Sequence, residues 1–210
     1  MRSKRTSYRR FFSNIKEQFI PKNSLNFRRR RKKIQKERIK YVAIFGVEIV
    51  AVILFAFFMI RAFGIRREML GDSMAPTIGE EQVVLINKVA YVFSEPKAND
   101  IIEFLPSGNL NAKASIKRVI AVPGDTVYIS NGTLFVNDEV FKDVAKTESI
   151  ANAGLADTAI TLKDDEYFVL GDNRNNSEDS RYQTIGNISK ANILGKVWLN
   201  VSLDNFGLVQ

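Results

Sequence analysis

A serine in the run Gly71-Asp72-Ser73-Met74-Ala75-Pro76-Thr77 is the first residue of this chain whose setting indicates chemistry. A serine hydroxyl is a weak nucleophile at neutral pH and needs a base within hydrogen-bonding reach. The usual base is histidine, and the 210 residues contain none. If Ser73 is a nucleophile, a lysine or a carboxylate must therefore accept its proton. The chain also lacks cysteine, which excludes disulfides, thiol nucleophiles and thiolate metal sites.

Two side chains are plausible bases for Ser73. Lys117 lies in the middle of the predicted strand Ser115–Val122, where strand alternation places it on one face with Val119. Apolar neighbours desolvate an ammonium group, lower its pKa and make a neutral amine available. The alternative base is Asp72, which adjoins the serine but points the other way in an extended chain. Both bases remain open on residue types alone.

A polar run of 11 residues, from Gly171 to Arg181, is the third feature with chemical potential. It combines hydroxyls, carboxylates, amides and guanidinium groups, although a solvated loop could also have this composition. The run does not fit a calcium-binding EF-hand loop, because Arg174 occupies the third position, where an oxygen ligand is needed. We expect no metal and no cofactor.

An apolar segment before Ser73 predicts a membrane anchor. From Val42 to Ile60 there are 19 residues with one charge, Glu48, and 13 of the 19 are Val, Ile, Leu or Phe. In a helix, this length matches the ~30 Å hydrocarbon core of a bilayer. The apolar residues favour insertion by about 4 to 8 kcal/mol, against up to ~3 kcal/mol for the carboxylate. A buried core helix is the alternative, but the segment is too uniformly apolar to be amphipathic.

The distribution of charge predicts how this anchor is oriented. Residues 1–40 hold 16 Lys/Arg and two acids, whereas residues 41–210 hold 15 Lys/Arg and 21 acids. By the positive-inside rule, the basic flank stays in the cytoplasm. We predict a polybasic cytoplasmic tail over residues 1–40 that touches anionic lipid, a transmembrane helix over 41–63 and an extracytoplasmic catalytic domain over 64–210. The protein would then cross the cell membrane once, with its catalytic domain on the outer face.

The external domain is predicted to be mainly β. Short β-branched or apolar runs are bounded by polar residues, and Asn131-Gly132 suits a two-residue type I′ hairpin turn. A helical turn is expected near Ala191, and residues 143–160 give no clear prediction. About 145 residues are enough for one core. The predicted strands are Gln82–Ile86, Asp100–Leu105, Ser115–Val122, Thr126–Ser130, Thr133–Asn137, Glu166–Leu170 and Lys196–Leu203.

Three motifs together carry a family resemblance. They are Ser73-Met74-x-Pro76-Thr77, Lys117-Arg118-Val119-Ile120-Ala121-Val122-Pro123-Gly124-Asp125, and the run from Gly171 to Arg181. In order and spacing, behind a single anchor, these motifs resemble the bacterial type I signal peptidases (leader peptidases). The single anchor and the lack of a large insertion are similar to the compact members typical of Gram-positive bacteria.

The resemblance implies a membrane-bound serine endopeptidase, a hydrolase that removes N-terminal signal peptides from exported preproteins after small residues in an Ala-x-Ala pattern. Ser73 would attack the scissile carbonyl, and Lys117 would take its proton and later protonate the leaving amine. Ser177 would orient the lysine amine, and Asp179 and Arg181 would form a supporting salt bridge. The residues that would line the substrate pockets are Met69, Leu70, Met74, Ile78 and Ile116.

Three positions depart from the family's pattern. Gly71 stands where some members have a serine whose hydroxyl aids the oxyanion, so that role would fall to the backbone N–H of Ser73, with the Gly71 or Asp72 region as a further source. Ala121 stands where glycine is common, which is a small change. Asn175 stands where aspartate is common, which removes a charge near the reacting residues but no proton-transfer group.

Other functions fit parts of the sequence. A relative specialised for one substrate, such as a pilus-type processing enzyme, would keep both reacting residues. A self-cleaving Ser/Lys repressor would need a DNA-binding domain where this chain has its apolar span. The basic run Arg28–Lys33 could bind nucleic acid, but beside an anchor it reads as a topology determinant. We expect preprotein signal peptides and the lipid bilayer as partners, with no nucleic acid and no obligate protein partner.

Overall fold

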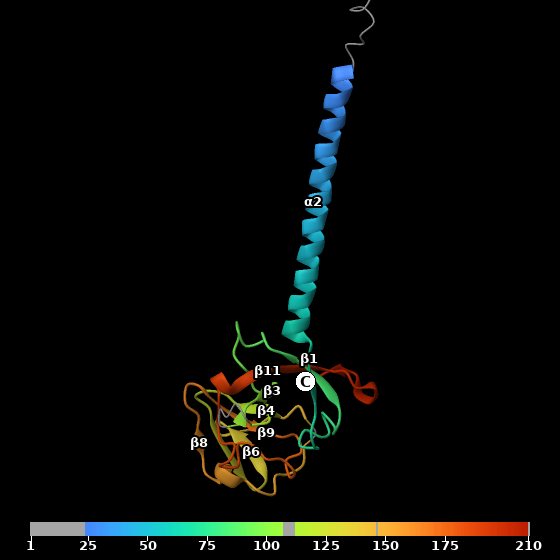
Figure 1. Cartoon of the computed structure of the whole chain (residues 1–210). Coiled ribbons are helices and arrows are strands. Elements are labelled where there is room, and N and C mark those ends of the chain that lie inside the picture. The colour runs from blue at the N-terminus through green and yellow to red at the C-terminus, as the bar shows by residue number, and fades with distance from the viewer. Residues whose placement is uncertain (1–23, 107–111, 146, 210) are drawn as a thin grey trace, which may run out of the picture. The chain divides into compact units, whose positions relative to one another are not determined.

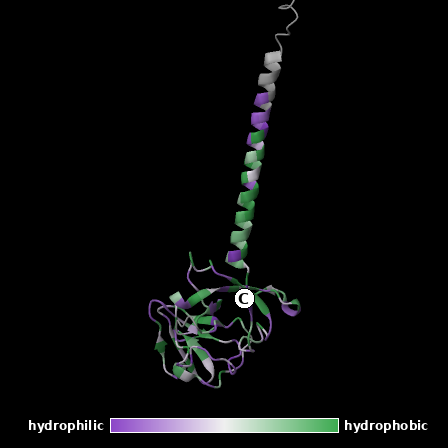
Figure 2. Cartoon of the chain, in the orientation of Figure 1, coloured by the Kyte–Doolittle hydropathy of each residue, from purple (hydrophilic) through white to green (hydrophobic). Residues whose placement is uncertain are grey.

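The computed structural model describes residues 24–106, 112–145 and 147–209, and the chain divides into two compact units, residues 1–56 and 57–210. Helix α2 (Ser24–Phe63) makes up the described part of the first unit and ends in the second. Its segment Gln35–Phe63 is long and apolar enough to cross a membrane, and Figure 2 shows most of it in green, with hydrophilic residues in purple toward its two ends.

The predicted anchor is therefore helical, but the helix begins at Ser24 rather than near residue 41. The residues between these points are rich in arginine and lysine, which are good helix formers. The side chains from 35 to 61 are exposed. A helix that exposes mostly apolar side chains needs a nonaqueous surrounding, which a bilayer supplies.

The second unit is mainly β, as predicted (Figure 1). Its larger antiparallel sheet has the strand order β1-β2-β11-β3-β4-β9-β10, with β12 paired to β11. These strands are β1 (Ile65–Glu68), β2 (Val83–Asn87), β3 (Ile101–Phe104), β4 (Ser115–Ala121), β9 (Glu166–Leu170), β10 (Ile188–Ser189), β11 (Ile193–Asn200) and β12 (Gly207–Leu208).

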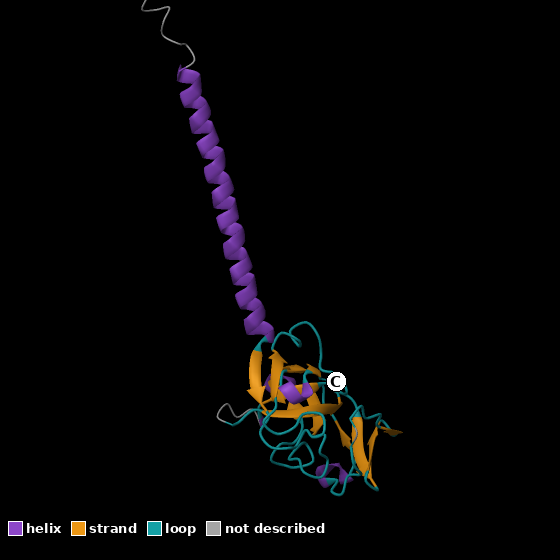
Figure 3. Ribbon diagram, turned by 90° about the vertical axis from the view of Figure 1, so that its right-hand side faces the viewer, coloured by secondary structure: helices purple, strands orange, loops and turns teal. Residues whose placement is uncertain are grey.

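A smaller antiparallel sheet has the order β7-β6-β5-β8, and Figure 3 shows the two groups of strands. Its strands are β5 (Thr126–Ser130), β6 (Thr133–Val136), β7 (Glu139–Val140) and β8 (Ile160–Thr161). Short 3-10 turns, η2 (Gly154–Asp157), η3 (Lys190–Asn192) and η4 (Leu203–Asn205), complete the unit. The turn expected near Ala191 is thus present.

The hairpin between β5 and β6 forms as predicted. Asn131 and Gly132 have φ values of 49° and 76°, and Ser130 pairs with Thr133 across the turn. Two successive residues with positive φ define a type I′ turn, whose twist suits the flanking strands.

The last long strand differs from its prediction. It covers Ile193–Asn200 rather than Lys196–Leu203, because Ser202 ends it. The Ser202 N–H donates to Asn200 Oδ1 (3.0 Å), and Ser202 Oγ accepts the N–H of Val83 (2.7 Å). Serine side chains that bond to nearby backbone groups favour turns over continued strands.

Three apolar clusters form the core of the second unit, and two of them matter for the site. One joins the two sheets through Phe168 and Leu170 of β9 and Val127 and Ile129 of β5. Another lies against the first strands of the larger sheet and consists of Met69, Met74, Ile78, Val84, Ile86, Ile101, Ile116 and Val197. We call this second group the Met74 cluster.

The final residues of α2 are fixed to the larger sheet. The Trp198 indole N–H donates to the Phe63 carbonyl (3.1 Å), and the Lys88 N–H donates to the Ala62 carbonyl (3.0 Å). The helix end, β1 and the Ser73 turn therefore follow one another directly within this unit.

Candidate active site

Ser73 lies on a tight turn that follows strand β1. Gly71 has a φ of 74°, a left-handed conformation that glycine adopts without steric cost. After the serine, the Ile78 N–H donates to the Met74 carbonyl (2.9 Å). Both of these apolar side chains are fully buried in the Met74 cluster. The serine is thus carried by a turn whose far end is fixed in the core.

Lys117 is brought onto Ser73 by strand β4. It pairs with Ile102 of β3 in the middle of the larger sheet, and it is only 5% exposed. Its Nζ lies 2.7 Å from Ser73 Oγ, a hydrogen-bonding distance between residues 44 positions apart. A hydroxyl and an amine in this contact can exchange a proton without rearrangement.

Burial lowers the pKa of the Lys117 amine, because the ammonium form loses hydration. The carboxylates of Asp179, Glu178 and Asp172 act in the opposite direction. Two of these carboxylates, Asp179 and Asp172, are themselves paired with arginines. Desolvation is the larger effect, so the amine gives up its proton more readily than an exposed lysine does.

Asp72, the alternative base, is directed elsewhere. Its exposed carboxylate accepts hydrogen bonds from the side-chain amides of Asn176 (2.9 Å) and Asn173 (3.3 Å). The Asn173 N–H also donates to the carbonyl of Ser73 (3.1 Å). Asp72 therefore joins the serine turn to the polar run, and of the two candidate bases it is Lys117 that contacts the hydroxyl.

Ser177 lies beside this pair but does not bond to it in this structure. A Cβ atom built on Gly171 would lie 2.2 Å from Ser177 Oγ and 2.5 Å from the Ser73 carbonyl oxygen, so the three residues pack tightly. Ser177 Oγ is buried and finds no hydrogen-bond partner among the described residues. A buried hydroxyl without a partner is costly. The orienting role of Ser177 stays a prediction.

Asp179 and Arg181 form a buried ion pair behind this loop. Arg181 Nε donates to Asp179 Oδ1 (2.8 Å) and Nη2 donates to Oδ2 (2.9 Å), a bidentate arrangement. The same carboxylate accepts the Gly171 N–H (3.1 Å), and Arg181 Nη2 donates to the Arg174 carbonyl (2.6 Å). The pair thus fixes both ends of the loop that carries Ser177.

A second buried ion pair, between Arg118 and Asp172, was not anticipated from the sequence. Arg118 Nε and Nη2 donate to the two carboxylate oxygens at 2.8 and 2.7 Å, and both side chains are fully buried. Thr77 Oγ1 donates to the same carboxylate. The pair therefore ties together β4 next to Lys117, the polar run and the serine turn. The only sign of this pair in the sequence was that Arg118, a charged residue, lies on the opposite face of β4 from Lys117.

The side-chain amide of Asn175 both accepts and donates a hydrogen bond. Its Oδ1 accepts the Ala151 N–H (2.9 Å), and its Nδ2 donates to the Ser149 carbonyl (3.1 Å). An aspartate could accept the first bond but could not donate the second. The departure from the family pattern therefore serves the contact with residues 149–151. The neighbouring Arg174 pairs with Asp143.

Four of the five predicted pocket residues lie together. Met69, Met74, Ile78 and Ile116 belong to the Met74 cluster and are at most 6% exposed. Leu70 is separate, with 68% of its surface exposed. The four buried residues form a closed apolar layer, which we call the floor, whereas Leu70 faces away from the core.

Two backbone edges are open on either side of this floor. Strand β1 ends the strand order of the larger sheet, and its outer edge pairs with no described strand. On β4, the pairing with β9 begins only at Arg118, so Ser115 to Lys117 are paired on the β3 side alone. Unpaired edges can take up an extended peptide by backbone hydrogen bonds.

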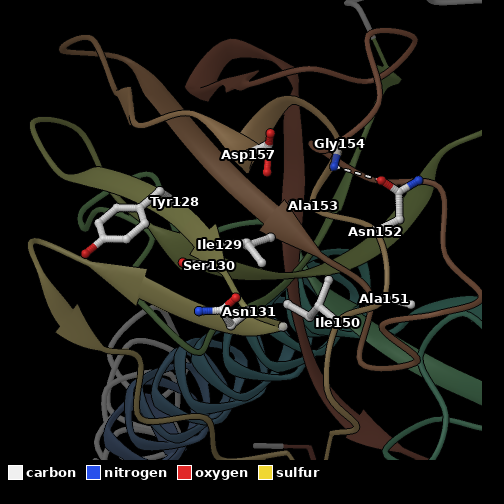
Figure 4. Close-up of a pocket in the computed structure, with 11 residues that line it drawn as sticks. Tyr128, Ile129, Ser130, Asn131, Ile150, Ala151, Asn152, Ala153, Gly154 and Asp157 are labelled. Carbon is white, nitrogen blue, oxygen red and sulfur yellow. Dashed lines mark hydrogen bonds between the residues drawn. The ribbon is translucent and has the colours of Figure 1, made fainter.

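An open pocket lies elsewhere, between the β5–β6 hairpin and residues 150–157 (Figure 4). Its volume is about 690 Å³, and it is lined by polar groups that include Asn131, Asn152 and Asp157. None of the predicted site residues lines it. Its connection to the site is indirect, through the Asn152 carbonyl, which accepts a hydrogen bond from Arg181 (3.0 Å).

The described fold is a mainly β unit behind a helix that is able to span a membrane. The sequence profile of the family described as "Signal peptidase, peptidase S26" matches residues 39–201. The chain belongs to this family and is a peptidase, which confirms the resemblance seen in the three motifs.

Individual relatives agree with this assignment. A probable signal peptidase I-2 of Synechocystis sp. is 34% identical over 151 residues, covering 67% of this chain and 67% of that protein. Signal peptidase I P of Bacillus subtilis subsp. natto is 31% identical over 169 residues, covering 77% and 90%. A crystal structure of a signal peptidase I from Enterococcus faecalis V583 shares 32% identity, covers 49% of this chain and 97% of that one, and has a TM-score of 0.40.

We expect Gly171→Ala to lower peptidase activity by about 100-fold, because the new methyl group would strike Ser177 Oγ and the Ser73 carbonyl and displace the serine turn. Gly207→Ala is the matched control, since a Cβ atom there meets nothing within 4 Å. The measurement is preprotein cleavage by both purified variants. Wild-type activity in Gly171→Ala would contradict the tight packing described above.

We expect Asp172→Asn to destabilise the second unit by about 3 to 5 kcal/mol, because it removes the carboxylate charge that faces the buried Arg118 guanidinium. Asp164→Asn, at an exposed position, is the control and should change stability little. Thermal unfolding of the detergent-solubilised proteins gives the comparison. Equal unfolding temperatures for the two variants would show that the buried pair is not a structural requirement.

Proposed function

We propose that this chain is a signal peptidase that uses Ser73 as nucleophile and Lys117 as general base to cleave N-terminal signal peptides from exported preproteins. The 2.7 Å contact between Lys117 Nζ and Ser73 Oγ is the main support. The names of the relatives, signal peptidase I, support the substrate class.

In the first step, the neutral Lys117 amine takes the Ser73 hydroxyl proton as Oγ attacks the scissile carbonyl. The resulting ammonium then protonates the leaving amine, and the C–N bond breaks to leave an acyl-serine. Water, deprotonated by the same amine, hydrolyses this ester and restores the hydroxyl. Lys117 takes up and gives back the proton in both steps, so the reaction needs no histidine.

The Ser73 N–H is the best candidate for stabilising the oxyanion. It donates to no described residue. The hydrogen bonds nearby are made by the Ser73 carbonyl, which accepts the Asn173 N–H, and by the Ala75 N–H, which donates to the Asp72 carbonyl. A backbone N–H that is free and fixed before the reaction stabilises developing charge without reorganisation. Gly71 contributes no side-chain donor, in agreement with its departure from the family pattern.

The substrate would bind as an added strand between the segment after β1 and the edge of β4. The outer edge of β1 and the edge of β4 from Ser115 to Lys117 pair with no further described strand, and Lys117 contacts Ser73 at the second of these edges. The floor beneath is the Met74 cluster, whose side chains are buried. Substrate side chains that rest on this closed surface would need to be small, which would favour an Ala-x-Ala pattern.

A membrane position follows from the chain order. The helix end is fixed to the sheet by Trp198 and Lys88, and Ser73 follows Phe63 by ten residues. If α2 spans the bilayer with its basic end in the cytoplasm, the site lies near the outer membrane boundary. A signal peptide, whose apolar part lies in the bilayer, presents its cleavage site at the same level.

We expect Ser73→Ala and Lys117→Ala each to reduce preprotein cleavage by about 10⁴-fold or more, because each removes one partner of the proton transfer. The exposed residues Ser130 and Lys142 provide matched controls, Ser130→Ala and Lys142→Ala, which should keep activity. Cleavage is followed with full-length protein in detergent. Substantial activity in either site variant would rule out the dyad.

We also expect the cleavage rate to rise with pH as Lys117 loses its proton, since only the neutral amine can act as a base. Because burial lowers the pKa of this amine, the midpoint should lie below the ordinary lysine value of about 10.4. A pH–rate profile of kcat/KM tests this. A single midpoint near 4 would instead point to a carboxylate such as Asp72.

A further inference from the structure

An ion pair outside the reacting residues joins two distant strands of the larger sheet. Arg67 of β1 donates through Nε to Oε1 of Glu103 in β3. Strands β2 and β11 lie between β1 and β3 in the sheet order, so the sheet must curl for these side chains to meet. Glu103 is 1% exposed, whereas the Arg67 side chain is 44% exposed. One end of the pair is buried, and the other is open to solvent.

The pair lies on the same face of the sheet as the predicted substrate floor. Arg67 pairs with Val84 across β1 and β2, and Glu103 pairs with Ile116 across β3 and β4. Directly opposed residues share a face, and Val84 and Ile116 both belong to the Met74 cluster. The ion pair therefore borders this cluster and links β1 with β3, next to Ile116 of β4.

Arg67 and the reacting residues lie at different points along the proposed substrate path. Arg67 precedes Ser73 by six residues, which span at most about 20 Å when extended. A signal peptide runs from the bilayer toward the site, as this chain runs from Phe63 to Ser73. The two segments are then parallel, and the substrate residue beside Arg67 precedes the cleaved bond by about four to six positions.

Arg67 has hydrogen-bonding capacity that the fold does not use. Its Nε is bound to Glu103, but its two Nη groups bond to no described residue. Glu103 Oε2 is buried and also lacks a described partner. A guanidinium fixed at Nε presents its two Nη groups as a planar fork, which matches the two oxygens of a carboxylate.

We propose that Arg67, held in place by Glu103, is a specificity-determining residue that binds an acidic side chain of the signal peptide four to six positions before the cleaved bond. This inference rests on the proposed function. The contact with Arg67 would lie before the small residues of the Ala-x-Ala pattern. At that point the apolar part of a signal peptide gives way to its polar end.

The test uses the full-length protein in detergent with preprotein substrates that share an Ala-x-Ala site. Each substrate carries Glu, Gln or Lys at the fourth, fifth or sixth residue before the bond. For wild type, we expect kcat/KM to be about threefold to fivefold higher with Glu than with Lys at one of these positions, the size expected of a partly exposed ion pair. In Arg67→Gln this ratio should fall to about one.

The adjacent Arg66 provides a matched control, because alternation along β1 places its exposed side chain on the opposite face. Arg66→Gln should keep the wild-type ratio of kcat/KM between the Glu and Lys substrates.

A second variant, Arg67→Lys, serves if Arg67→Gln proves unstable. It keeps the positive charge but loses the planar pair of Nη donors, so its Glu-to-Lys ratio should be smaller than that of wild type. A Glu-to-Lys ratio of one in wild type, or one that persists in both Arg67 variants, would overturn the proposal. Failure of wild type to cleave any of the substrates would reject the proposed function itself.

Discussion

Burial of the Lys117 amine against the Ser73 hydroxyl is the constraint around which the site is built. An ammonium group removed from water is unstable unless it is paired, so a buried lysine that lacks its own carboxylate partner tends to lose its proton. The two nearest buried carboxylates, Asp179 and Asp172, are each paired with a guanidinium. The arginines thereby compete with the lysine for these negative charges. Desolvation can then dominate, and the amine is left able to act as a base.

The same two ion pairs also hold the site together. Arg118 adjoins Lys117 on β4, Asp172 is the second residue of the polar run, and Thr77 ends the serine turn. Asp179 and Arg181 fix the remainder of the polar run through the Gly171 N–H and the Arg174 carbonyl. The close packing at Gly171 leaves no room for displacement. Three segments that are far apart in sequence are thus positioned by buried charges rather than by local secondary structure.

Local features of this fold could be predicted from the sequence, whereas long-range pairings could not. The Asn131-Gly132 turn and the apolar helix follow from residue types within a few positions. The pairs Arg118–Asp172 and Arg67–Glu103 join residues 54 and 36 positions apart, and no pattern in a single chain encodes them.

The site itself was only partly predictable for the same reason. The strand pattern around Lys117 indicated a desolvated lysine, but its contact with Ser73 depends on how β1 and β4 meet. The last strand was displaced because side-chain bonds of Ser202 end it early, an effect that apolar alternation does not register. Ser177 was placed in the polar run by the motif alone, and its bond to the lysine is absent here.

Direct titration of the Lys117 amine is the most decisive measurement. Carbon-13 labelling of the lysine Cε atoms, with the Lys117→Met variant to assign the signal, allows its pKa to be read by NMR in detergent. A neutral buried base requires a value clearly below the ordinary lysine pKa of about 10.4. A value at or above 10.4 would mean that the ammonium form is held at working pH, and Lys117 could not then be the base that activates Ser73.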